Sequence, residues 1–246
     1  MIDPAELPVR VAEVRERIEA ACARVRRPPD EVTLVGVSKT HPAALAEAAW
    51  RAGVRVFGEN RVQEALGKSA ELAHLPPPPE GPEWHLIGPL QSNKVRAALD
   101  LFRTIHSIDR LKIAEAIDRE AAARGLRVDG FLEVNVGGES SKHGFTADGL
   151  AEQVLPLAGL SASPRVGLRI VGLMAIPPFG EDREASRRWF IRLRELRDEL
   201  ASRPEWAGFP GLLSMGMSHD YEVAVEEGAT HVRVGTALFG VREVTG

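Results

Sequence analysis

Cysteine and tyrosine are almost absent from this chain of 246 residues, which has one of each. The single cysteine, Cys22, excludes an internal disulfide and every metal motif that needs several cysteines. Cys22 lies on the apolar face of a predicted amphipathic helix, so we interpret it as a core residue and not as a nucleophile. The histidines are scattered without metal-ligand spacing, and we therefore expect no metal site.

Long apolar runs and a charge excess are also missing. No run of about eighteen apolar residues occurs, so we expect no transmembrane helix. The first twenty residues mix acidic and basic side chains and contain no apolar segment of the kind that a secretory signal needs. The net charge of -4 gives no general attraction to nucleic acid or to anionic membranes. We expect a soluble cytoplasmic protein.

Lysine is scarce as well, and one lysine stands at an informative position. An unbroken apolar run from Val32 to Val37 is followed by Ser38, Lys39 and Thr40. A continuous run of β-branched residues is typical of a strand that is buried on both faces. A lysine at the end of such a strand would lie on the rim where α/β folds place their chemistry. The alternative is a lysine that merely extends into solvent.

Eight short apolar segments alternate with helical stretches along the chain, after one amphipathic helix within residues 1–27. We expect strands at residues 32–37, 54–58, 84–88, 104–108, 130–136, 168–175, 211–215 and 231–234. This alternation predicts an α/β protein that folds as a single (β/α)8 TIM barrel over residues 32–240. No linker divides the chain, so residues 1–246 are predicted to form one domain. We expect Ser92 or Asn93 to cap the helix after the third strand.

The segments after the last two strands resemble an anion site. Ser214-Met-Gly-Met-Ser218 precedes a helical stretch, and Gly235-Thr236 follows Arg233 and the eighth strand. Glycines let the backbone approach an anion, and N–H groups and hydroxyls bind it. The same two loops are the usual phosphate site of this fold. Tight turns made of small residues are the alternative for either loop alone.

A phosphate site opposite a strand-end lysine suggests a phosphorylated carbonyl compound held as a Schiff base. A lysine amine is suited to this bond, because burial and nearby cations favour its neutral, nucleophilic form. Two ligands fit these residues: a sugar phosphate, as in aldolases, or pyridoxal 5'-phosphate (PLP).

Six segments carry a resemblance to a known family. They are VGVSKTHP, FGENRVQE, WHLIGPLQSNK, EVNVGGESSKHGF, GLMAIPP and LSMGMSHDYEVAVEEGATHVRVGTALFG. In this order they resemble the pyridoxal-phosphate homeostasis protein family (YggS/PROSC). The resemblance implies the barrel of the alanine racemase N-terminal domain without the C-terminal β-domain of that enzyme. It also implies a protein that binds PLP without established turnover and that carries or buffers the cofactor.

The resemblance assigns roles to residues of this chain. Lys39 would form the Schiff base, Asn60 would lie near the pyridine ring, and Arg233 would face the ring nitrogen. A permanent cation there disfavours protonation of the nitrogen and makes the ring a weaker electron sink. The other expected cofactor-binding residues are Met174, Ser214, Met215, Gly216, Ser218, Gly235 and Thr236.

Two positions depart from the family pattern. His41 stands where many relatives have a second lysine, and we interpret it as a solvated loop residue. The lysine-rich C-terminal end of some members is missing, whereas Lys142 in the ESSKHG loop is retained. Any transfer of PLP to apo-enzymes that depends on those amines is therefore open.

The alternative function is a PLP-dependent racemase or decarboxylase of the same barrel type. Racemisation by two bases needs a second acid–base group opposite the lysine. The only tyrosine, Tyr221, falls in the helix after the seventh strand, and the only cysteine falls in the first helix. A Schiff-base aldolase would need an acidic residue and a second lysine near the first. We therefore predict a monomeric PLP carrier and no enzyme, and only a weak racemase activity stays compatible with the sequence.

Overall fold

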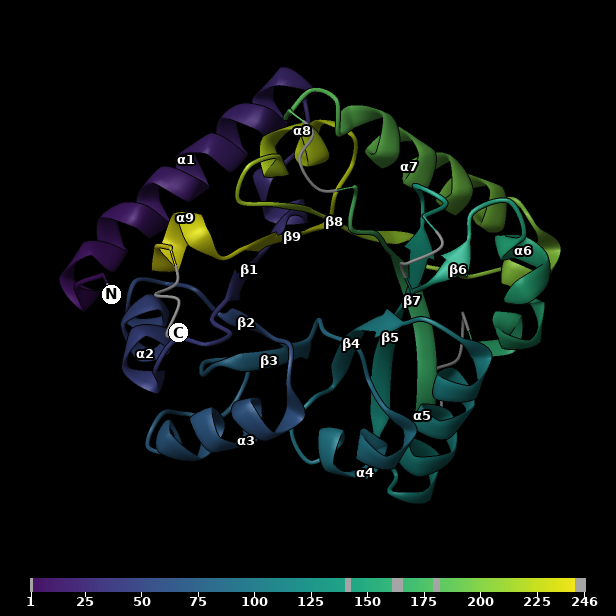
Figure 1. Ribbon diagram of the computed structural model, residues 1–246, viewed down its shortest axis with the longest axis horizontal. Coiled ribbons are helices and arrows are strands. Elements are labelled where there is room, and N and C mark those ends of the chain that lie inside the picture. Colours follow the sequence, from purple (N-terminus) through teal and green to yellow (C-terminus); the bar gives the residue numbers. More distant parts are fainter. Residues whose placement is uncertain (1, 140–142, 161–165, 179–181, 242–246) are drawn as a thin grey trace.

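The computed structural model describes residues 2–139, 143–160, 166–178 and 182–241. Within them, eight parallel strands close into a barrel that helices surround (Figure 1). The barrel strands are β1 (Thr33–Val37), β2 (Val56–Glu59), β3 (Glu83–Leu86), β4 (Thr104–Ile108), β5 (Arg127–Asn135), β7 (Gly167–Met174), β8 (Leu212–Met217) and β9 (His231–Val234). Pairing runs from β4 through β3, β2, β1, β9, β8 and β7 to β5, and β5 pairs with β4 to close the ring. The predicted (β/α)8 barrel is confirmed.

Strand bounds differ from the predicted ones at two places that affect the site. β8 runs on to Met217, two residues beyond the predicted end, and the register shifts between Ser214 and Met217. Gly216 lies at this irregularity with φ of +88°, a conformation that glycine adopts easily. A short strand that was not predicted, β6 (Phe145–Thr146), pairs with the end of β5.

The helices form the outer layer. They are α1 (Leu7–Arg24), α2 (Ala43–Arg51), α3 (Val62–Glu71), α4 (Val95–Ala98), α5 (Leu111–Ala123), α6 (Leu150–Gln153), α7 (Arg187–Ala201), α8 (Tyr221–Glu226) and α9 (Thr236–Phe239). The prediction that Ser92 or Asn93 caps a helix is wrong. Gln91 precedes a 3-10 turn over Ser92–Lys94, and no side chain makes the capping hydrogen bond.

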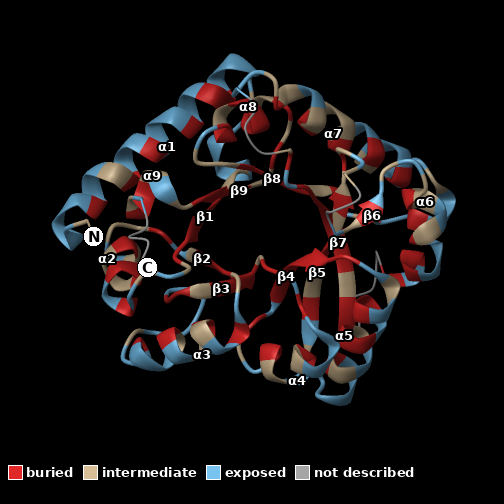
Figure 2. Cartoon of the chain, viewed as in Figure 1, coloured by how far each residue is buried: buried red, intermediate tan, exposed pale blue. Residues whose placement is uncertain are grey.

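The main core lies between the strands and the helices (Figure 2). The buried residues of the helices lie mainly on the side of each ribbon that faces the barrel and the exposed ones on the outer side, as an amphipathic repeat predicts. Phe57, Phe102 and Phe190 are fully buried there, and each such side chain contributes about 1.5–3 kcal/mol by leaving water. Cys22 is also fully buried, so its interpretation as a core residue is confirmed.

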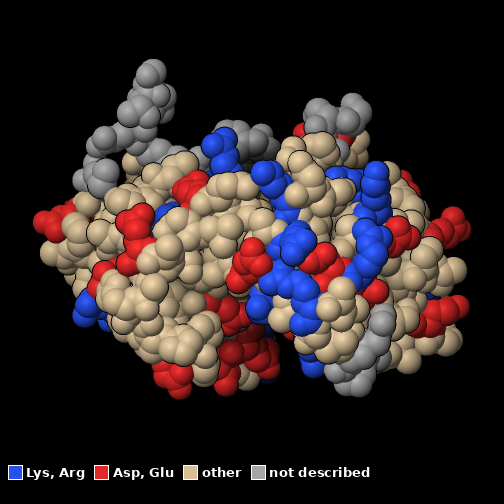
Figure 3. Space-filling view, turned by 90° about the horizontal axis from the view of Figure 1, so that it is seen from below, with Lys and Arg blue, Asp and Glu red and all other residues tan. Residues whose placement is uncertain are grey.

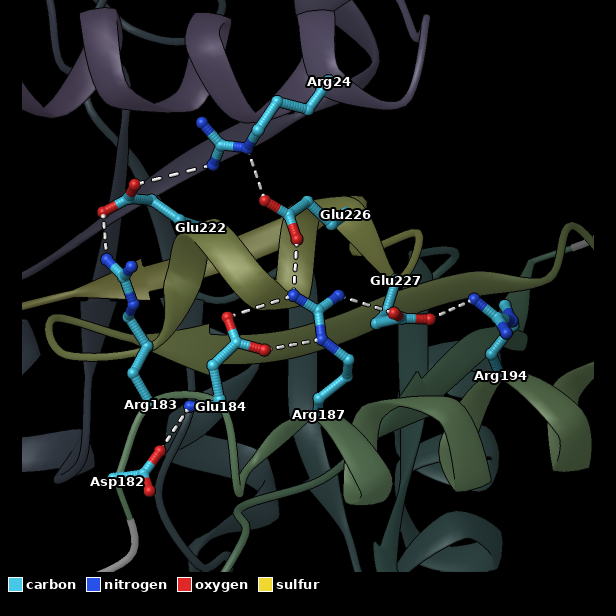
Figure 4. Close-up of polar contacts among 9 residues, drawn as sticks. All are labelled: Arg24, Asp182, Arg183, Glu184, Arg187, Arg194, Glu222, Glu226 and Glu227. Atoms are coloured by element: carbon cyan, nitrogen blue, oxygen red, sulfur yellow. Dashed lines mark hydrogen bonds and ion pairs between the residues drawn. The ribbon is translucent and has the colours of Figure 1, made fainter.

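The first helix, α1, lies across the last elements of the chain, α8 and α9 (Figure 1). Ion pairs join α1 to α8, and α8 to α7 (Figure 4). Arg24 Nε lies 2.6 Å from Glu226 Oε1, and Arg187 Nη2 lies 2.6 Å from the other oxygen of that carboxylate. Arg187 also pairs with Glu227 at 2.8 Å. Because these pairs share partners, they form a network that holds three helices together.

The surface in Figure 3 shows acidic and basic side chains close to one another on one face of the molecule. Among the residues that the structure describes, no helix has both the length and the apolar character that are needed to span a bilayer. The described ranges also contain no group of three or more histidine, cysteine or acidic side chains arranged to hold a metal ion.

Candidate functional site

A cavity of about 650 Å³ lies at the carboxyl ends of β1, β2, β8 and β9. This is the rim where barrels of this kind place their binding sites. Six of the ten predicted cofactor-binding residues line it: Lys39, Asn60, Ser218, Arg233, Gly235 and Thr236. The chain therefore brings the lysine after β1 and the two loops after β8 and β9 to one cavity.

Lys39 lies in a turn two residues after the end of β1, which ends at Val37 as predicted. The His41 N–H donates to Ser38 O at 3.0 Å and closes this turn around Lys39 and Thr40. Thr40 has φ of +66°, which is uncommon for a residue with a branched side chain. Such strained backbone persists only where surrounding contacts hold it.

A buried ion pair supplies those contacts. Lys68 from α3 lies with its Nζ 2.5 Å from Glu59 Oε1, and both side chains are almost fully buried. The same Nζ donates to Ser38 O at 2.8 Å, and Ser38 Oγ donates to Glu59 Oε1 at 2.6 Å. On the other side of Lys39, the Thr40 N–H donates to Glu64, which also pairs with Lys68. This group, the Lys68–Glu59 pair, thus fixes the backbone on both sides of Lys39.

Burial sets the electrostatics of the Lys68–Glu59 pair, because the Glu59 carboxylate is removed from solvent. Burial raises the pKa of Glu59, and the hydrogen bonds from Lys68 and Ser38 offset only part of that effect. Glu59 Oε2 is buried and has no hydrogen-bond partner among the described residues. The carboxylate therefore depends on Lys68 for its stability in the folded chain.

Asn60 is placed by a close approach of two chain segments. A Cβ on Gly88, just after β3, would lie 2.5 Å from Asn60 O and 2.7 Å from Asn60 Cα. Only glycine fits there without a shift of the backbone. This contact holds the residue after β2 against the segment after β3, with Asn60 at the wall of the cavity.

Ser218 joins the two loops that were predicted to bind an anion. Its Oγ accepts hydrogen bonds from Gly235 N at 3.1 Å and from Ala237 N at 3.3 Å. The loop after β8 is thereby held against the loop after β9. Thr236 and Ala237 stand beside them at the cavity, so hydroxyl and N–H donors gather in one corner of it.

Arg233 reaches the cavity from β9 and is 5% exposed. Its Nη1 donates to Ser214 Oγ at 2.6 Å and its Nη2 to Ala175 O at 2.9 Å. Burial lowers the pKa of Arg233 to about 10, although the carboxylates of Glu133 and Asp220 favour its charged form. The guanidinium therefore stays a cation at neutral pH.

Four predicted residues do not line the cavity, and β8 explains three of them. Because β8 continues to Met217, Ser214, Met215 and Gly216 are strand residues and not part of a loop. Ser214 is buried inside the barrel beside Arg233, and Met215 packs in the core on the helix side. The fourth residue, Met174 on β7, is buried against Phe131 and Val171.

Several residues that were not predicted do line the cavity. Met217 is adjacent to Ser218, and Ile176 follows the end of β7. The sequence signal for both residues is that each lies within two residues of the end of a predicted strand. His41 lines the cavity too, and its ring centroid lies 5.4 Å from that of Phe239. His41 lies in a loop, as predicted, and is partly exposed where it lines the cavity. Lys142 lies outside the described residues.

The residues at this cavity fit a phosphorylated aldehyde. Lys39 offers an amine, Ser218 and Thr236 offer hydroxyls, and the backbone of Gly235 lies beside them at the cavity. Arg233 adds a buried cation at the floor. A barrel with a lysine after the first strand and such loops after the last two defines a class, the PLP-binding barrels related to alanine racemase.

Comparisons with known proteins agree with that class and narrow it. The family model "Alanine racemase, N-terminal domain" matches residues 9–243. The pyridoxal phosphate homeostasis protein of Pseudomonas aeruginosa is 46% identical over 233 residues, which cover 95% of this chain and 94% of that protein. The protein of the same name from Aquifex aeolicus is 45% identical over 234 residues, covering 95% and 97%. The chain belongs to the pyridoxal phosphate homeostasis protein family.

Solved structures show the same relationship. PipY of Synechococcus elongatus with PLP bound superposes with a TM-score of 0.76 at 40% identity, over 92% of this chain and all of that one. Alanine racemase of Corynebacterium glutamicum shares only the fold, with a TM-score of 0.66 and 16% identity. That match covers 96% of this chain but 62% of the racemase, whose chain extends beyond the barrel.

Proposed function

We propose that this chain binds PLP in the cavity at Lys39 and serves PLP homeostasis by holding and releasing the cofactor in the cytoplasm. One observation carries the proposal: Lys39 and the Ser218–Gly235–Thr236 corner line the same cavity of about 650 Å³. A relative at 40% identity has PLP bound in its structure. Ser218 and Thr236 would hold the phosphate, and Asn60 would lie near the pyridine ring.

The bound cofactor would supply an aldehyde that condenses with the Lys39 amine to a Schiff base, with loss of one water. The chain's own residues set the conditions for this bond. The Lys68–Glu59 pair fixes the turn that carries Lys39, and Arg233 places a cation at the floor of the cavity. A guanidinium gives its proton away poorly, so a ring nitrogen that faces it stays unprotonated.

Holding the cofactor without turnover is the function that these residues favour. A racemase needs a second acid–base group on the face opposite the lysine. Tyr221 cannot serve, because its ring is buried in α8 and is 1% exposed. Cys22 is buried in α1 at a distance in the fold from the cavity lining. Among the described residues that line the cavity, only His41 and His219 could act as a second acid–base group, and no tyrosine, cysteine or carboxylate is present. The incubation with L-alanine described below tests whether either histidine serves in this way.

The proposal is tested by the absorption spectrum of the purified protein during titration with PLP. The near-visible band of a lysine Schiff base should appear and saturate at one PLP per chain. Lys39→Ala should abolish the band while far-UV circular dichroism stays unchanged, and Lys112→Ala, on the exposed side of α5, should behave as wild type. An unchanged band in Lys39→Ala would overturn the proposal.

Catalysis is tested separately by prolonged incubation of the PLP-loaded protein with L-alanine. Chiral chromatography should detect at most traces of the D-isomer. Robust formation of D-alanine would favour the racemase function instead.

A further inference from the structure

A row of buried polar side chains runs through the barrel beneath the cofactor cavity. Glu83 Oε1 lies 3.0 Å from His85 Nε2, and His85 Nδ1 lies 2.9 Å from His106 Nε2. His106 Nδ1 then lies 2.7 Å from Ser214 Oγ, which accepts from Arg233 at 2.6 Å. The five residues come from β3, β4, β8 and β9 and form one continuous hydrogen-bonded chain, here called the barrel chain.

The barrel chain connects the two mouths of the barrel. Its inner members are almost fully buried, with His106 and Ser214 at 0% exposure. Arg233, at one end, lines the cofactor cavity. Glu83, at the other end, is the first residue of β3 and lines a separate cavity of about 210 Å³ with the first residues of other strands. A half-exposed carboxylate at the lower mouth is thus linked to a cation at the upper one.

When both imidazole rings are neutral, the two ends fix the direction of every hydrogen bond between them. A guanidinium only donates, and a carboxylate only accepts. The hydrogen bond from His85 lowers the pKa of Glu83, which is therefore a carboxylate at neutral pH. Burial, with help from the neighbouring His85, His231 and Arg233, lowers the pKa of His106 well below its usual value, so its imidazole is neutral.

With both rings neutral, one arrangement then satisfies all the bonds. Ser214 accepts from Arg233 and donates its hydroxyl proton to His106 Nδ1. His106 carries its proton on Nε2 and donates it to His85 Nδ1, and His85 donates from Nε2 to the carboxylate. The reverse arrangement of neutral rings would set a bare His85 nitrogen against the carboxylate, and two acceptors would repel each other.

We infer that Glu83, His85, His106 and Ser214 are positioning residues that hold the Arg233 guanidinium in one orientation at the floor of the cofactor cavity. This inference rests on the proposed function for the role of that cavity. Other groups also face the members of the chain: the carboxylates of Glu133 and Asp220 attract Arg233, and the His231 ring packs on His85 and His106. None of these groups replaces the hydrogen bond from Arg233 Nη1 to the Ser214 hydroxyl, and this bond fixes the position of Nη1.

The first test needs no cofactor. Long-range ¹H–¹⁵N spectra of the PLP-free protein distinguish ring nitrogens that carry a proton from those that do not. His85 and His106 should both carry theirs on Nε2 at neutral pH. Glu83→Ala should destroy this single pattern, whereas Glu83→Gln keeps an acceptor and should preserve it. A proton on His106 Nδ1 in the wild type would overturn the inference.

The second test measures PLP binding with Ser214→Ala, its conservative partner Ser214→Thr, and the matched control Ser107→Ala. Ser107 is the neighbour of His106 on β4, but its hydroxyl donates to Gly88 O at 2.5 Å, outside the barrel chain. Ser214→Ala should weaken PLP binding about tenfold and shift the near-visible band, since a cation at the ligand loses a charge-assisted hydrogen bond. Ser214→Thr should restore both, and Ser107→Ala should match wild type.

The outcomes of the second test separate this inference from the function beneath it. A wild-type protein without any Schiff-base band would refute the proposed function. A normal wild-type band together with unchanged affinity and spectrum in Ser214→Ala would overturn only the positioning role.

Discussion

Replacing Lys68 by methionine should destabilise the protein strongly and disturb the cofactor site at once. The Lys68 side chain is 5% exposed and that of its partner Glu59 is fully buried, with Lys68 Nζ 2.5 Å from Glu59 Oε1. Lys68→Met leaves a carboxylate in the interior with Ser38 as its remaining hydrogen-bond donor. Removing one partner of a buried pair costs about 3–5 kcal/mol. We expect the free energy of unfolding at pH 7 to fall by about that amount in urea denaturation.

The pH dependence of this loss tests its cause. Burial already raises the pKa of Glu59 in the wild type, and loss of Lys68 raises it further. A carboxyl group whose pKa is higher in the folded state binds protons on folding, so stability falls as pH rises through that pKa. The penalty of Lys68→Met should therefore shrink when unfolding is measured at pH 4.5 instead of 7.

Two matched variants complete the experiment. Lys112→Met removes an exposed lysine from α5 and should leave stability within about 0.5 kcal/mol of wild type. The double variant Lys68→Met/Glu59→Gln removes both charges and should recover much of the loss. A penalty below about 1 kcal/mol, or one that is the same at both pH values, would refute the argument that Lys68 neutralises a buried carboxylate.

Three further predictions concern other parts of the barrel. Gly216→Ala should cost about 2 kcal/mol of unfolding free energy in urea, because φ is +88° there and a Cβ would lie 2.5 Å from Ala224 Cβ; an unchanged midpoint would contradict this. Ser218→Ala should weaken PLP binding about tenfold in a spectroscopic titration, because the hydroxyl that orders the loop after β9 is lost; equal affinity would refute its role. Arg187→Ala should reduce stability less at pH 3 than at pH 7. Burial alone would raise the pKa of Glu226, but hydrogen bonds from Arg187 and Arg24 lower it. The ion pair therefore stabilises the protein at pH values above the usual carboxyl range, and this stabilisation is lost as the pH falls. Stability that does not depend on pH in this way would count against the network in Figure 4.

Much of the fold followed from the sequence because its apolar segments are periodic. Strands at Thr104–Ile108 and His231–Val234 have the predicted bounds. Lys39 and the Gly235–Thr236 segment were found because the residue after a barrel strand faces the rim. Gly216 was predicted to begin a loop, because a glycine inside a strand looks like the start of one. Here it marks a bulge that lets β8 continue to Met217.

The polar interior of the barrel could not be read from single strands. His85 and His106 sit in short apolar runs, and the sequence does not say whether a strand residue faces the barrel or the helices. That choice depends on the register between strands, which pairing and barrel closure decide. The burial of the Lys68–Glu59 pair could not be predicted from the sequence either. Lys68 occurs in an amphipathic helix where a lysine is usually solvated, and only the packing of α3 against β2 buries it.

The most direct measurement of the central claim is to locate the lysine that PLP modifies. The protein is loaded with PLP, reduced with borohydride to fix the imine, digested and mapped by mass spectrometry. We predict a single modified peptide with the cofactor on Lys39. Modification of Lys94 or Lys142 with Lys39 untouched would contradict the account, because the amine that binds the cofactor would then lie outside the turn that follows β1.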